Sequence, residues 1–134
     1  MTKIGLSLSL VAFVGVMVAS TLPAQAQSAE VRLKASMVSG AASGKAEYRE
    51  RGNRKRLNVQ AEDLAGSTIS LQNVYINGVS VGTMALAACP APATQLLCGE
   101  MELNSQDGQV APQVRTGDTV SVGFSPAVLA GVFR

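Results

Sequence analysis

Val74-Tyr75-Ile76-Asn77-Gly78-Val79-Ser80-Val81 carries the strongest structural signal in this chain. An Asn-Gly pair between two alternating apolar runs is typical of a β-hairpin, because a two-residue type I′ turn needs positive φ at both central positions. With Asn77 and Gly78 as the turn, the register follows by counting outwards. We expect the opposing pairs Ile76–Val79, Tyr75–Ser80 and Val74–Val81, with the four aliphatic side chains on one face and Tyr75 and Ser80 on the other.

The apolar face changes parity just after this hairpin. Val79 and Val81 are odd-numbered, whereas Met84 and Leu86 continue the apolar face as even-numbered residues. One extra residue must therefore be absorbed, and Gly82 is the expected position of a β-bulge.

The same period of two runs through the chain on both sides of the hairpin. We predict strands over residues 30–38, 45–51, 54–62, 68–76, 100–104, 119–124 and 128–133, and an extended edge or loop around Pro112. The expected inward-facing side chains are Val31, Leu33, Ala35, Met37, Ala46, Tyr48, Leu57, Val59, Ala61, Val120, Val122 and Phe124. The sequence thus predicts a single antiparallel all-β domain over residues 27–134, a β-sandwich or barrel-like fold of about eight short strands.

Residues 1–26 have the features of a secretory signal helix. Lys3 precedes an apolar run over residues 4–18, and Ala24-Gln25-Ala26 fits the small-x-small cleavage rule. A membrane anchor is the alternative, but an apolar run of about 15 residues is short for a span of roughly 20. We therefore expect export to the periplasm or outside the cell, with no transmembrane span in the mature chain.

The charges of the mature chain are nearly balanced. The full sequence has 11 basic and 9 acidic residues, and Lys3 is the only charged residue of the leader. A chain so close to neutrality is not expected to bind nucleic acid.

Cys89 and Cys98 are the only cysteines, and the chain has no histidine. In an exported protein this predicts a disulfide, because two cysteines alone do not complete a structural zinc site. A redox-active pair is the alternative, but the intervening residues, with two prolines, do not form a redox motif. We expect Cys89 directly opposite Cys98 on an antiparallel ladder, which puts Leu86 opposite Met101 and the cystine on the solvent face.

Several segments of the chain resemble the elements NGV-x-VGT, GE-x-EL, DG and GD-x-V of small exported bacterial β-rich proteins. They are Ile76–Thr83, Gly99-Glu100-Met101-Glu102-Leu103, Asp107-Gly108-Gln109, Gly117-Asp118-Thr119-Val120 and Ala130-Gly131-Val132-Phe133. The resemblance covers nearly all of the mature chain and implies a small exported β fold. It implies no activity, because that family has no established one. The cysteine-bounded insert over residues 89–98 departs from the simpler loop expected there.

The residue types that commonly carry catalysis are few. Without histidine, Ser-His-Asp and Cys-His nucleophilic sites are excluded. Glu100 and Glu102 share a strand face and form the one candidate carboxylate pair for glycoside hydrolysis, but such acids are more often a solvated surface. Asp107 and Asp118 lie beside turn glycines, where turn formation is favoured over calcium binding. No catalytic, cofactor-binding or metal-binding residue is therefore expected.

The most concentrated feature is a basic cluster around the predicted Gly52-Asn53 turn. Its members are Arg49, Arg51, Arg54, Lys55 and Arg56, with Lys45 nearby. One interpretation is a charge set that protects an exposed hairpin from aggregation. The other is a site for an anionic partner, namely a polysaccharide, a lipid headgroup or an acidic protein. The sequence thus predicts an exported non-enzymatic structural or interaction module of unknown partner, with binding of an anionic envelope or extracellular polymer as the alternative.

Overall fold

The computed structural model describes residues 29–123 and 127–134. The predicted signal peptide and the inward position predicted for Phe124 lie outside these residues. The described helical structure is limited to one short turn, and no helix there is long and apolar enough to cross a bilayer.

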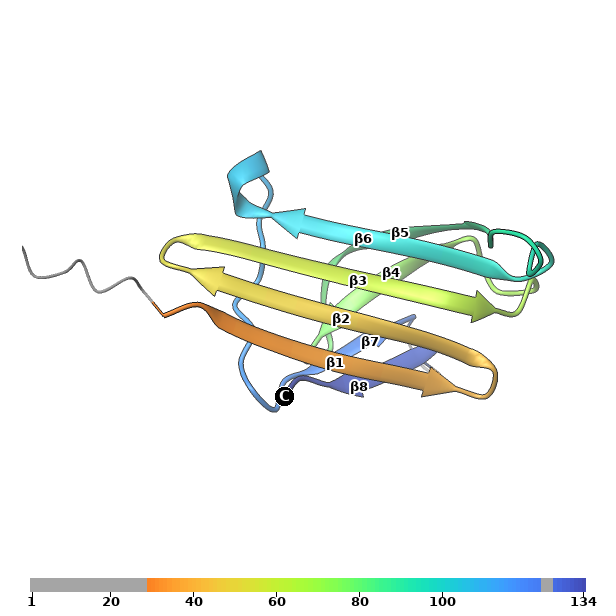
Figure 1. Cartoon of the computed structure of the whole chain (residues 1–134), viewed down its shortest axis with the longest axis horizontal. Coiled ribbons are helices and arrows are strands. Elements are labelled where there is room, and N and C mark those ends of the chain that lie inside the picture. Colours follow the sequence, from red (N-terminus) through yellow and green to blue (C-terminus); the bar gives the residue numbers. More distant parts are fainter. Residues whose placement is uncertain (1–28, 124–126) are drawn as a thin grey trace, which may run out of the picture.

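The described residues form eight strands and one 3₁₀ turn (Figure 1). They are β1 (Val31–Ser39), β2 (Ala42–Arg51), β3 (Arg54–Leu64), β4 (Leu71–Ile76), β5 (Val79–Ala88), β6 (Leu97–Asn104), η1 (Ser105–Asp107), β7 (Thr119–Val122) and β8 (Leu129–Val132). All strand pairs are antiparallel, in the order β1-β2-β3-β6-β5-β4-β7-β8. The predicted all-β, barrel-like fold is confirmed.

The sheet curls until its two outer strands almost meet. Reciprocal backbone bonds join Lys34 and Arg134, from Lys34 N–H at 3.0 Å and from Arg134 N–H at 2.9 Å. Gly131 on β8 lies against β1, where a Cβ atom would collide with the carbonyl oxygen of Ser36. Figure 1 shows the result as a front layer of β1, β2, β3 and β6 over a back layer that contains β7 and β8.

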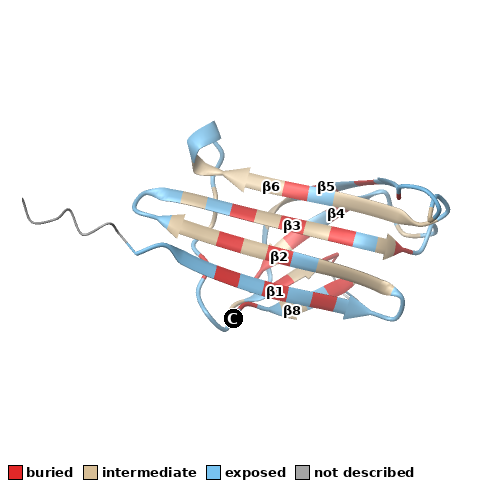
Figure 2. Ribbon diagram, in the orientation of Figure 1, coloured by how far each residue is buried: buried red, intermediate tan, exposed pale blue. Residues whose placement is uncertain are grey.

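The alternation predicted from the sequence produces the core (Figure 2). The largest side chains with almost no exposure are Tyr48, Phe133, Met37, Leu57, Leu64, Met84, Leu129, Val59, Val74, Val114, Val120 and Val122. Val31 and Val79 were expected to face inward, but they are 41% and 67% exposed. Both are the first residue of their strand, and the alternation of apolar residues begins there before the strand reaches the buried core.

The central hairpin has the predicted turn and, in part, the predicted register. Asn77 and Gly78 have φ values of 50° and 78°, and Ile76–Val79 and Tyr75–Ser80 are opposed as expected. Val74, however, pairs with Gly82 and not with Val81, so Val81 is the extra residue of the bulge. Gly82 has another role, because a Cβ atom there would lie 2.7 Å from the Met101 sulfur.

The disulfide between Cys89 and Cys98 is confirmed, with a Cα–Cα distance of 4.9 Å. The predicted register around it is wrong by two residues: Leu86 pairs with Gly99, and Cys89 donates its N–H to Leu96 O at 2.8 Å. The cystine therefore joins the two strands diagonally. Cys89 is 3% exposed and not on a wet surface, while Cys98 is partly buried.

Strand limits differ from the prediction mainly where small residues lie. β2 starts at Ala42 inside the predicted loop, because Gly44 can pack against Gln60 O and Leu129. β6 starts at Leu97, next to the disulfide, and β4 only at Leu71. Residues 110–114 form no strand. Of the two predictions for the segment around Pro112, an edge strand or a loop, the structure therefore shows the loop.

The segment from η1 to β7 is anchored through Tyr48. The Tyr48 hydroxyl donates to Glu50 Oε2 at 2.8 Å. Gln113 donates to the same Glu50 oxygen at 2.7 Å. These donors hold the pKa of Glu50 below its ordinary value, while burial and the neighbouring carboxylate raise the pKa of Tyr48.

Tyr48→Phe is expected to lower the free energy of unfolding by about 1.5 kcal/mol, because the hydrogen bond between the Tyr48 hydroxyl and the charged Glu50 is lost. Urea denaturation followed by circular dichroism measures this loss. Tyr75→Phe, at a partly exposed position of β4, serves as the matched control and should cost less. An unchanged midpoint for Tyr48→Phe would show that the hydroxyl does not anchor the segment.

Candidate anion-binding site

The basic cluster lies at the turn between β2 and β3. Gly52 occupies the left-handed region there, with φ of 59°. Antiparallel pairing places Arg49 opposite Arg56 and Arg51 opposite Arg54. Tyr48 and Leu57 on the same strands are buried, so the alternation directs these four arginines to the outer face of the sheet.

A hollow of about 140 Å³ brings the whole predicted cluster together. Its lining residues are Arg49, Arg51, Arg54, Lys55, Arg56, Asn104 and Gln106, and we call it the basic hollow. Asn104 and Gln106 were not predicted, because they reach the turn only through the pairing of β3 with β6, which sets Arg56 opposite Asn104.

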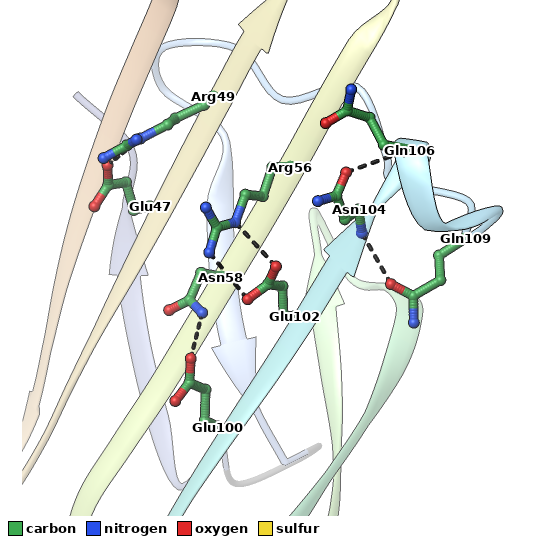
Figure 3. Close-up of polar contacts among 9 residues, drawn as sticks. All are labelled: Glu47, Arg49, Arg56, Asn58, Glu100, Glu102, Asn104, Gln106 and Gln109. Carbon is green, nitrogen blue, oxygen red and sulfur yellow. Dashed lines mark hydrogen bonds and ion pairs between the residues drawn. The ribbon is translucent and has the colours of Figure 1, made fainter.

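The side chains of Asn104 and Gln106 form one side of the basic hollow, which we call the amide wall. Local hydrogen bonds hold the Asn104 side chain and the backbone of this segment in place (Figure 3). Asn104 Oδ1 accepts from the Gln106 N–H at 3.0 Å and caps η1. The Asn104 N–H donates to Gln109 Oε1 at 3.0 Å. The Lys55 N–H donates to Ser105 Oγ at 2.9 Å, which ties η1 to the β2–β3 turn.

Two of the five cations have a carboxylate partner (Figure 3). Arg49 Nε lies 2.6 Å from Glu47 Oε1, and Arg56 holds both oxygens of Glu102, at 3.0 and 3.1 Å. The hydrogen bond and charge of Arg49 hold the pKa of Glu47 below its ordinary value. Within the described part of the chain, the side chains of Arg51, Arg54 and Lys55 form no ion pair within 4.0 Å.

Arg32 extends the basic surface onto β1 and was missed from the sequence. It lies opposite Arg49, which itself lies opposite Arg56, so three arginines form a row across three strands. Arg32 contacts Glu30 at 3.2 Å. Lys45 is opposite Ser36 and Gln60, farther along the sheet, and does not line the basic hollow.

The other candidate residues have structural roles. Glu102 is bound to Arg56, and Glu100 Oε1 accepts from Asn58 Nδ2 at 2.6 Å. Asp107 ends η1 before Gly108, which has φ of 77°. Asp118 accepts from the Arg115 N–H at 2.8 Å across its turn, and hydrogen bonds from Asn77 and this amide lower the pKa of Asp118.

A cavity of about 420 Å³ lies at the other end of β3 beside the disulfide. Glu62, Asp63 and Glu100 contribute carboxylates to its wall. Asp63 and the two sulfurs lie within 4.8 Å of one another. Cysteine binds a metal as its thiolate, and both sulfurs are joined in the disulfide, so this group offers a metal only the Asp63 carboxylate.

No protein-family model and no curated protein matches this chain in sequence.

Proposed function

We propose that the protein is an exported, non-enzymatic interaction module that binds an anionic polysaccharide in the basic hollow. The observation that carries this proposal is a group of three cations, Arg51, Arg54 and Lys55, that form no ion pair within 4.0 Å among the described residues and that line the basic hollow beside the amide side chains of Asn104 and Gln106. Unpaired cations on one concave surface attract anions, and guanidinium groups bind sulfate, phosphate or carboxylate in a bidentate manner.

Export is supported by two features of the chain. Residues 1–26 have the charge, apolar run and cleavage pattern of a signal peptide. The Cys89–Cys98 disulfide is compatible with an oxidising compartment. We place the protein in the periplasm or outside the cell.

A polysaccharide is favoured over a lipid headgroup or an acidic protein by the amide wall. Asn104 and Gln106 can exchange hydrogen bonds with sugar hydroxyls. The basic hollow also continues into a polar sheet face through the row of Arg32, Arg49 and Arg56, which suits a linear polymer.

A non-enzymatic role is supported by the bonds that already engage the carboxylates of Glu100 and Glu102. Hydrolysis of a glycoside needs one carboxyl as acid and one as base or nucleophile, but Glu102 is bound to Arg56 and Glu100 to Asn58. Turnover of a glycan that is lost in Glu100→Gln would contradict this part of the proposal.

The triple variant Arg51→Ser, Arg54→Ser, Lys55→Ser is expected to lose retention on immobilised dextran sulfate. Each exposed contact is worth about 1 kcal/mol or less, so three together correspond to a loss of affinity of up to about 100-fold. The parent should stay bound at physiological salt and should elute only at a higher salt concentration, which screens the charges. Affinity chromatography with a salt gradient measures both.

The triple variant Lys34→Ser, Lys45→Ser, Arg115→Ser is the matched control. It removes the same charge from exposed side chains outside the basic hollow and should keep most of the retention. Equal loss in both variants, or elution of the parent below physiological salt, would refute a specific site. Tighter binding of the parent to anionic lipid vesicles than to the polysaccharide would assign the site to lipid headgroups.

A further inference from the structure

Two of the five cations in the basic hollow already hold a carboxylate of the same chain. Glu47 accepts from Arg49, and Glu102 binds Arg56 through both oxygens (Figure 3). We propose that Glu47 and Glu102 act as tethered competitors, which make the basic hollow selective for sulfate or phosphate esters over carboxylates. This inference rests on the polysaccharide binding proposed above.

The selectivity follows from what each kind of anion offers these arginines. A carboxylate on the polymer would replace an identical group that the sheet holds at high effective concentration, so the exchange gains little. A sulfate or phosphate ester presents three oxygens. Two of them can satisfy one guanidinium while the third accepts from the next arginine row. Arg51 and Arg54 form that next row, about 7 Å further along the strands.

The charges around the two carboxylates keep them available as competitors. Glu47 lies opposite Lys34 on β1 and opposite Asn58 on β3. Arg49, Lys34 and Arg32 all favour its charged form and lower its pKa, so Glu47 is ionised at neutral pH. The groups that face Glu102 are Arg56 and Asn58 on β3 and Glu100 on its own strand.

Both carboxylates can be changed without affecting the core. The side chains of Glu47 and Glu102 are 35% and 36% exposed, and each contacts an arginine on the outer face. Glutamine keeps the shape of glutamate and removes its charge. The double variant Glu47→Gln, Glu102→Gln therefore frees Arg49 and Arg56 while the strands stay in place.

The test compares three polymers of matched length and charge density: dextran sulfate, dextran phosphate and polygalacturonate. The parent should bind at least one ester polymer more tightly than polygalacturonate. In the double variant, affinity for polygalacturonate should rise about three- to tenfold, as expected from the release of two exposed ion pairs, and the preference for esters should shrink. Comparison of the two ester polymers shows which ester binds more tightly.

The double variant Glu62→Gln, Asp63→Asn is the matched control. It removes the same charge at the end of β3 remote from the basic hollow, where neither residue forms an ion pair with an arginine of the described residues. An equal gain in this control would refute the tethered competitors and indicate a general charge effect. Equal binding of all three polymers by the parent would refute the selectivity alone, whereas binding of none would refute the proposed function itself.

Discussion

Gly131→Ala is expected to lower the free energy of unfolding by about 3 kcal/mol, roughly twice the loss expected for Tyr48→Phe. A Cβ atom at this position would collide with the Ser36 carbonyl oxygen and lie 2.9 Å from Met37 Cγ. The neighbour is backbone, which cannot rotate away as a side chain can. β8 must then move away from β1 and break the closing bonds between Lys34 and Arg134.

Urea denaturation followed by far-UV circular dichroism measures this effect. Ala130→Ser is the control, because residue 130 is exposed on the other face of β8 and should change stability by less than about 0.5 kcal/mol. Equal midpoints for Gly131→Ala and Ala130→Ser would show that the close approach of β8 to β1 is not required for the fold.

The double variant Cys89→Ser, Cys98→Ser is expected to lose about 2.7 kcal/mol of stability, the chain-entropy value for a closed loop of about ten residues. The bond is the only covalent constraint on the loop between β5 and β6. Denaturation of the variant, and of the parent with and without reductant, measures the loss. Reduced parent and variant should agree.

The same variant separates stability from binding. The disulfide lies beside Leu97 at one end of β6, and the basic hollow includes Asn104 at the other. Retention on dextran sulfate should therefore be unchanged at temperatures where the variant is folded. Loss of retention in a folded variant would contradict the assignment of binding to the β2–β3 turn.

Local patterns were sufficient to predict most of this fold. A period of two and turn residues such as Asn77 and Gly78 act over a few positions, so strands and turn type follow directly from the sequence. The β5–β6 register could not be predicted in the same way. A slip of two residues keeps every side chain on its face, and the apolar pattern therefore fits both Leu86–Met101 and the observed Leu86–Gly99 pair.

The structural role of the glycines within strands could not be predicted from the sequence either. The predicted strand began only after Gly44, and Gly82 was the predicted bulge, but at both positions another part of the chain approaches closely. That partner, Gln60 in one case and Met101 in the other, is remote in sequence. Only the folded sheet shows that these positions require glycine because a side chain would prevent close packing, and not because the chain turns there.

The candidate site was predictable to the extent that it is local. Arg49 to Arg56 are adjacent in sequence, and a hairpin necessarily gathers them. Arg32 joins them from β1 and Asn104 from β6. The sequence of the β2–β3 hairpin does not determine which strands pair with its two outer edges. The ion pair between Arg56 and Glu102 was unforeseeable for the same reason, although it decides how many cations remain free.

The strand order also governs the sequence of events during folding. The hairpins β1–β2, β2–β3 and β4–β5 join neighbouring residues and can form early, whereas β3–β6 pairing must enclose β4 and β5 in a loop. Contacts between β1 and β8 span almost the whole described chain, so their loop-closure entropy is the greatest. Chains with such non-local topology typically fold in milliseconds to seconds. Until β8 docks, the edge of β1 is unpaired. The charges of Arg32 and Lys34 on β1 then oppose aggregation with other partly folded chains.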